Sequence, residues 1–117
     1  MENIEFTEIE LLDIDWDKIE FPVNSREIEI PANVKSISTR EDALCIGTTI
    51  IENCRSNHKF SDYVLVAAVH FTSDNIWCFD YSIDQHDKDV NDLIDCGGFH
   101  VAIDGSKCEL IKAWMDE

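Results

Sequence analysis

The stretch Tyr63–Phe71 has the sequence YVLVAAVHF, an almost unbroken apolar run of the length of one β-strand. The polar cluster TSDN at 72–75 follows it and predicts a turn. The next run, Ile76–Ile83 (IWCFDYSI), alternates between two faces, and one of them carries large side chains: Trp77, Phe79, Tyr81 and Ile83. The two runs therefore predict a β-hairpin whose aromatic face packs in the core.

A second hairpin is predicted near the C-terminus. Gly97 and Gly98 open it, and its strands are Phe99–Asp104 and 109–114. We expect Asp104 and Gly105 to supply the positive-φ residues that a tight hairpin turn needs.

An amphipathic helix over 38–54 is predicted before the hairpins. Ser38 and Glu41 have the spacing of a capping box at its start. The apolar side chains that follow form a stripe at helical spacing: Ala43, Leu44, Ile46, Ile50, Ile51 and Cys54. Gly47 lies inside this helix and costs about 1 kcal/mol relative to alanine, so we expect another element to pack closely against it.

Two interpretations of the N-terminal region stay open. Acidic and apolar residues alternate over 8–11 and 13–17, and again over 27–30, as in a strand with one buried and one solvated face. A helix over 8–19 is the alternative, because the same region contains a helical stripe: Ile9, Leu12, Trp16 and Ile19.

Together these elements predict a single α+β domain over residues 1–117. It consists of an acidic N-terminal arm, 1–30, and a body, 31–117, with one helix and two β-hairpins. A chain of 117 residues is too short to give each of two cores enough buried surface. Antiparallel neighbours with one helix favour a curved antiparallel sheet of about four to six strands packed around that helix.

Charge limits the classes of partner. The chain has 25 acidic against 9 basic residues, a formal net charge of −16, and ten of the acids lie within 1–31. Such a field repels nucleic acids and anionic membranes and favours a partner with a basic surface. No run approaches the ~20 apolar residues of a membrane span, and the start lacks the features of a signal peptide, so we expect a cytoplasmic protein.

Little in the sequence points to a cofactor, a metal or a nucleophile. The five cysteines are irregularly spaced without a Cys-x-x-Cys pair, which favours free thiols in a reducing compartment. Gly97 and Gly98 lack the residues that complete a phosphate-binding loop. The acidic segment 84–89 is too charged for a core and predicts a solvated loop, ending in a helical turn through Leu93 and Ile94, rather than a metal site.

Four segments resemble one family. They are Tyr63–Phe71, the start of Ile76–Ile83 (IWCF), GGFHVAID at 97–104 and ELIKAW at 109–114. Over about residues 30–115 the chain resembles the bacterial immunity proteins with a nuclear-transport-factor-2-like fold. The arm before residue 30 has no counterpart there, and Cys108 stands in a turn where the family tends toward Gly or Lys.

The resemblance implies a cone-shaped sheet around one helix and a function in toxin neutralisation. Members of such families bind the cognate toxin of a contact-dependent or secreted system, and many of these toxins are nucleases with basic substrate surfaces. The resemblance thus implies a protein partner with a basic surface, which agrees with the acidic surplus of this chain.

Acidic residues beside apolar ones are the candidate partner-binding residues, because a carboxylate held in a desolvated interface contributes most. They fall into two groups. The first lies in the arm: Asp13, Asp15, Trp16 and Asp17. The second lies in the loop between the hairpins: Asp84, Asp87, Asp89 and Asp92. For any single residue named, the slightly favoured interpretation is a merely solvated face.

Two other functions are consistent with the sequence. A small isomerase or hydratase of the same fold would need an acid/base pair, with two polar strand residues within about 3 Å of each other in an apolar pocket. The candidates are His70, Asp80, Tyr81 and His100. The alternative for these residues is that Asp80 lies on the solvated face and Tyr81 packs its ring in the core. An acidic mimic of nucleic acid would instead space its carboxylates like phosphates.

Overall fold

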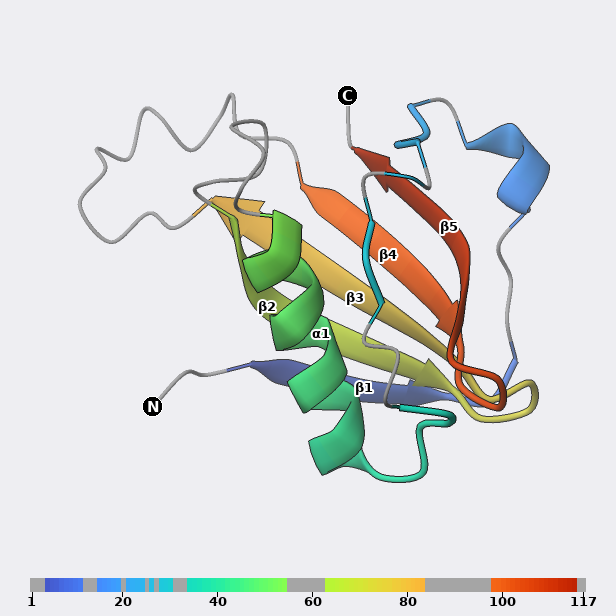
Figure 1. Cartoon of the computed structure of the whole chain (residues 1–117). Coiled ribbons are helices and arrows are strands. Elements are labelled where there is room, and N and C mark those ends of the chain that lie inside the picture. The colour runs from blue at the N-terminus through green and yellow to red at the C-terminus, as the bar shows by residue number, and fades with distance from the viewer. Residues whose placement is uncertain are drawn as a thin grey trace.

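The computed structural model describes residues 4–11, 15–19, 21–24, 26, 28–30, 34–54, 63–83 and 98–115. One helix packs on a five-stranded open sheet, so the fold is α+β as predicted (Figure 1). The elements, in chain order, are β1 (Glu5–Ile9), the 3-10 helix η1 (Trp16–Lys18), α1 (Arg40–Cys54), β2 (Tyr63–Phe71), β3 (Ile76–Ile83), β4 (Phe99–Asp104) and β5 (Glu109–Met115).

The strands lie in the order β1-β2-β3-β4-β5, and the sheet is mixed rather than purely antiparallel. Strands β2 to β5 pair antiparallel with their sequence neighbours. Strand β1 pairs parallel with β2, from Glu5 opposite Ala67 to Ile9 opposite Phe71. The prediction of an antiparallel sheet is wrong at this edge because the chain returns to β2 through a long crossover that contains α1, and such a crossover joins parallel strands.

Both predicted hairpins are confirmed, with turns at 72–75 and 105–108. The expected positive φ at Asp104 and Gly105 is wrong. Among the described residues, positive φ occurs at Asn75 (52°) and Cys108 (53°). Gly105 has a different role, since a Cβ there would lie 2.7 Å from the Asn75 carbonyl oxygen, which accepts a hydrogen bond from the Gly105 amide. The glycine lets the two turns approach each other.

The predicted helix is confirmed, but its cap is one residue later than expected. The helix begins at Arg40, and the Thr39 hydroxyl oxygen accepts a hydrogen bond from the Asp42 amide at 3.1 Å. Thr39 rather than Ser38 therefore caps it, because only Thr39 reaches an unpaired amide of the first turn. The expected stripe is buried at Ala43, Ile46, Ile50, Ile51 and Cys54, with Leu44 partly buried.

The core lies between α1 and the sheet. Trp77, Phe79 and Tyr81 are buried on the face of β3 toward the helix, as predicted, while the side chain of Ile83 lies outside the described part. The Tyr81 hydroxyl donates to the Gly47 carbonyl at 2.7 Å. Burial, followed by the nearby Cys54 and Asp80, raises the pKa of Tyr81 well above its usual value, so the hydroxyl keeps the proton that it donates.

Neither interpretation of the N-terminal region is right as a whole. Glu8 and Ile9 belong to β1, which rules out a helix over 8–19, and Trp16 and Asp17 lie in η1, which contradicts a strand over 13–17. Residues 28–30 form no strand, and Asp13 and Glu27 lie outside the described residues. The parallel register with β2 fixes β1, and the Asp15 carboxylate accepts from the Asp17 amide at 3.1 Å and so begins η1.

Residues 21–23 pair with the opposite edge of the sheet. Pro22 forms an antiparallel bridge with Trp114 of β5. The Val23 amide donates to the Ala113 carbonyl at 2.8 Å, and the Met115 amide donates to Phe21 at 2.9 Å. The N-terminal region therefore contacts both edges, through β1 at one and through this short pairing at the other.

Candidate binding surface

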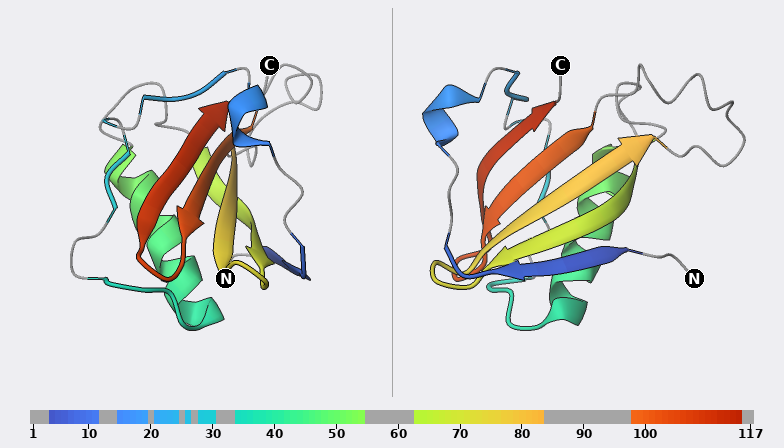
Figure 2. Two further views of the ribbon diagram at one scale, coloured as in Figure 1. Left: turned by 90° about the vertical axis from the view of Figure 1, so that its right-hand side faces the viewer. Right: turned by 180° about the vertical axis from the view of Figure 1, so that it is seen from behind.

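The two faces of the sheet have different surroundings. Helix α1 covers one face, and we call the opposite one the outer face (Figure 2). Cross-strand partners share a face, so the register defines one outer-face row that crosses all five strands: Glu5, Ala67, Asp80, His100 and Trp114.

A polar and aromatic column is built on this row. His100 Nδ1 lies 2.6 Å from Asp80 Oδ1, and the two side chains are 19% and 35% exposed. The His100 ring stacks on the Trp114 ring, with 5.3 Å between their centroids. The Trp114 ring in turn packs against the ring of Trp16 in η1, with 6.0 Å between centroids. The column fixes η1 over the β4–β5 side of the outer face.

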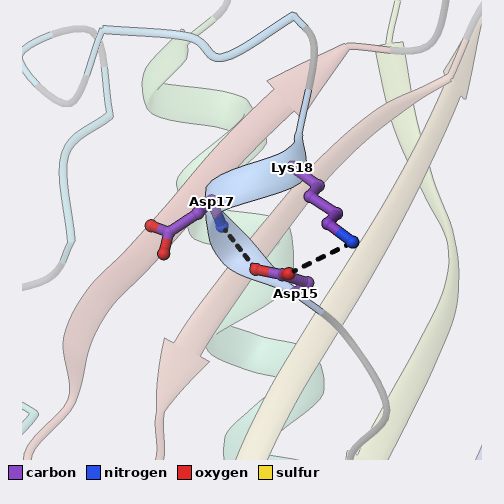
Figure 3. Close-up of polar contacts among 3 residues, drawn as sticks. All are labelled: Asp15, Asp17 and Lys18. Carbon is purple, nitrogen blue, oxygen red and sulfur yellow. Dashed lines mark hydrogen bonds and ion pairs between the residues drawn. The ribbon is translucent and has the colours of Figure 1, made fainter.

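Three residues of the first predicted group, Asp15, Trp16 and Asp17, lie at η1, beside this column. Asp15 and Asp17 are exposed on either side of the partly buried Trp16. Figure 3 shows the Asp17 side chain directed away from Asp15, whose carboxylate lies 3.9 Å from Lys18 Nζ. That ion pair is exposed and contributes little to stability. Asp13 lies outside the described residues, as does the whole second group: Asp84, Asp87, Asp89 and Asp92.

Of the four residues of the enzyme hypothesis, the structure brings two together, Asp80 and His100, 2.6 Å apart on the outer face. Asp80 and His100 face outward, whereas Tyr81 points to α1 and bonds to Gly47. His70 stacks on Trp77 with 4.0 Å between centroids, and its Nε2 lies 2.8 Å from Asn75 Oδ1. The quartet is thus divided between the two faces. Asp80 lies on the expected face, but it is half-buried rather than simply solvated.

Sequence reasoning named Asp80 and His100 among four candidates for an acid/base pair, but it did not indicate which two would pair, and it missed the stack on Trp114. Alternation assigns Asp80 to the outward face of its strand, and His100 and Trp114 can be assigned in the same way. The missing information was that β3 and β4 pair, because the two hairpins are separated by a long segment. A search for acidic and basic residues that could face each other on adjacent strands of the two hairpins could have found the pair.

The described cysteines offer no activated thiol on this face. Burial, together with the carboxylate of Asp80, raises the pKa of Cys78 from 9.0 to about 12. Cys108 is also buried, and burial raises its pKa. Among the residues that the structure describes, no group of three or more His, Cys, Asp or Glu side chains is placed to hold a metal ion.

We expect alkylation to distinguish Cys45 from Cys78 in the folded protein. Cys45 is exposed, whereas the raised pKa leaves Cys78 with roughly a thousandfold less thiolate than an ordinary thiol near neutral pH. Peptide mass spectrometry after a short iodoacetamide treatment at pH 8 should find Cys45 modified and Cys78 intact. In denaturant both should react at similar rates, and rapid native modification of Cys78 would contradict the burial.

Comparisons of the chain with protein-family models, curated proteins and solved structures gave no match.

Proposed function

We propose that this chain is an immunity protein that binds and neutralises a cognate bacterial toxin with a basic surface. It acts in the cytoplasm by forming a protein complex rather than by catalysis. The observation that carries the proposal is the placement of Asp15 and Asp17, exposed on both sides of a Trp16 that packs on Trp114, in a chain of net charge −16.

This arrangement supports binding for two physical reasons. An aromatic side chain that already packs on the protein loses little conformational freedom when a partner covers it. Carboxylates beside it can then pair with Lys or Arg in a partly desolvated setting, where a charged hydrogen bond is stronger than at a wet rim. The overall charge adds long-range attraction to a basic partner and so raises the association rate.

The proposal includes the finer description of the fold as nuclear-transport-factor-2-like. Its support is the packing of the single helix α1 across β2 and β3, on one face of a sheet whose strands β2 to β5 form a meander. The parallel strand β1 at the edge is an addition from the region for which the family offers no counterpart.

Nucleic acids and membranes are not the partners that we propose. Both carry negative charge and would be repelled by a chain of net charge −16. In the part of the chain that the structure describes, no helix is long and apolar enough to cross a bilayer.

We expect a toxin-like protein to be encoded next to this gene, and the deciding experiment uses that protein. We expect co-expression of this chain to restore growth of cells that produce the toxin, and we expect the two proteins to co-purify. The measured association rate should fall steeply with salt, because the Debye length shortens from about 10 Å at 0.1 M to about 3 Å at 1 M. Absence of both rescue and co-purification would refute the proposal.

Neutralising the η1 acids should slow association. We expect the double variant Asp15→Asn and Asp17→Asn to lower the association rate roughly threefold to tenfold. The matched control is Glu29→Gln with Glu52→Gln, which removes the same charge from two other exposed positions. Equal effects of the two double variants would show that net charge alone, and not this patch, governs the encounter.

A further inference from the structure

The half of the outer face formed by β1 and β2 carries apolar side chains that no described element covers. Trp16 is the only contribution from outside the strands to the apolar cluster of the outer face, among the described residues. It packs on Trp114 of β5, and Figure 2 shows η1 beside β5, at the opposite edge from β1. We call the β1–β2 half the open face; its exposed and partly exposed residues are Glu5, Thr7, Ile9, Val66, Ala67 and Val69, while Phe71 of the same half is buried.

Two large aliphatic side chains of the open face are exposed to solvent. Ile9 is 43% exposed and Val66 38% exposed, while Ala67 and Val69 are partly exposed between them. The register shift between Leu65 and Ala67 marks a β-bulge, and Val66 is the extra residue. Parallel strands are normally covered on both faces, so exposed aliphatic side chains beside the parallel pair β1–β2 favour burial by a partner.

The charges around the open face select the chemistry of that partner. Strands β1 to β3 contain no Lys or Arg, and their outer-face carboxylates are Glu5 and Asp80; Glu8 lies on the opposite face, 3.8 Å from His70. Glu5 and Asp80 lie in the same outer-face row, on either side of Ala67. A partner therefore meets aliphatic groups bordered by negative charge, which is complementary to a surface of Lys or Arg around an apolar centre.

A second copy of this chain does not fit the open face. Each copy would bring a net charge of −16 and the same carboxylates of the open face to the contact. Like charges placed opposite one another at an interface strongly disfavour the contact. The partner is therefore a different protein of opposite charge.

We propose that the open face is the docking site for an apolar segment of the toxin flanked by Lys and Arg. This inference rests on the proposed function and adds the location and the chemistry of the contact. A specific interface covers about 800 Å² on each partner, more than six side chains of two strands present, so the contact extends across the sheet toward η1. Asp15 and Asp17 then lie within reach of the same partner.

The experiment places a positive charge on the open face and compares it with the same change elsewhere. Titration calorimetry with the toxin encoded next to this gene measures Kd for wild type, Glu5→Lys, Val66→Lys and Glu52→Lys. Glu52 is exposed on α1, so Glu52→Lys matches Glu5→Lys in net charge. We expect both open-face variants to raise Kd at least about tenfold and Glu52→Lys to stay within about twofold of the wild type.

Each outcome is decisive. Binding by wild type with unchanged Kd in both open-face variants would overturn the docking site and leave the proposed function in place. No binding by wild type would overturn the proposed function and the docking site with it. Self-association of the free protein through this face, seen by sedimentation and abolished by Val66→Lys, would assign the face to a second copy and overturn the inference.

A measurement without substitutions guards against variants that fold poorly. Hydrogen exchange of the wild-type protein, with and without the toxin, should show added protection in peptides from β1 and β2. Protection confined to the peptide that contains α1 would contradict the docking site even if the variants lose binding.

Discussion

Replacing Phe79 with alanine should lower the free energy of unfolding by about 3–5 kcal/mol. The ring is fully buried in the middle of β3, between Ala68 of β2 and Val101 of β4, and it packs against Gly47 of α1. Its loss removes contacts with the sheet and the helix at once, and close-packed neighbours cannot fully close the cavity. Urea denaturation measures the effect as a shift of the midpoint at constant m.

Two control variants separate the cavity from other effects. Phe79→Leu keeps most of the apolar volume and should cost clearly less than Phe79→Ala. Val66→Ala changes an exposed strand residue and should stay within about 0.5 kcal/mol of wild type. A loss below about 1 kcal/mol for Phe79→Ala would show that the aromatic face of β3 does not form the main core.

The predictable parts of this fold are those set by neighbours in the sequence. The hairpin of β2 and β3 follows from an apolar run, a polar turn and an alternating run, and all of this lies within Tyr63 to Ile83. The helix follows from a stripe of apolar residues at helical spacing. These signals are local, so periodicity alone predicts the elements.

The N-terminal region could not be predicted because its structure depends on distant partners. Strand β1 pairs with β2 more than fifty residues later, as Ile9 with Phe71 shows, and η1 is held by the contact of Trp16 with Trp114. A stretch that fits both a strand and a helix takes the structure that its tertiary contacts favour.

Details of caps and turns were also beyond local rules. By residue type Ser38 is a somewhat better cap than Thr39, and only the geometry shows that Thr39 Oγ1 reaches the Asp42 amide. Gly105 fits a positive-φ position by residue type, yet it serves the approach of one turn to Asn75 in the other. Contacts between turns are invisible to periodicity.

The candidate site also combines one part that local sequence predicts with another part that depends on contacts between distant residues. The sequence indicated Asp15, Trp16 and Asp17 as a patch because acids stand beside a large aromatic residue, and the structure places all three on η1 or at its cap. The sequence did not indicate the open face, because Ile9 joins the outer face of β2 only through the parallel register of β1, and Val66 lies in a β-bulge that periodicity does not predict.

Replacing Gly47 with alanine should destabilise the protein by about 1–3 kcal/mol, although the same change stabilises an ordinary helix interior by about 1 kcal/mol. A Cβ at this position would lie 2.8 Å from Phe79 Cδ1 and 3.1 Å from Leu65 Cδ2. Both side chains are buried in the core, so α1 would have to move away from the sheet. Thermal and urea denaturation of Gly47→Ala measure the sign directly.

The cause can be isolated with a double-mutant cycle. If the ring of Phe79 sets the penalty, Gly47→Ala should cost less in a Phe79→Leu background, because a smaller and more flexible side chain can yield to the new methyl group. Glu52→Ala, at an exposed position of the same helix, should be close to neutral, since glutamate and alanine have similar helix propensities. Stabilisation by Gly47→Ala in the wild-type background would mean that α1 does not approach the sheet as closely as this contact requires.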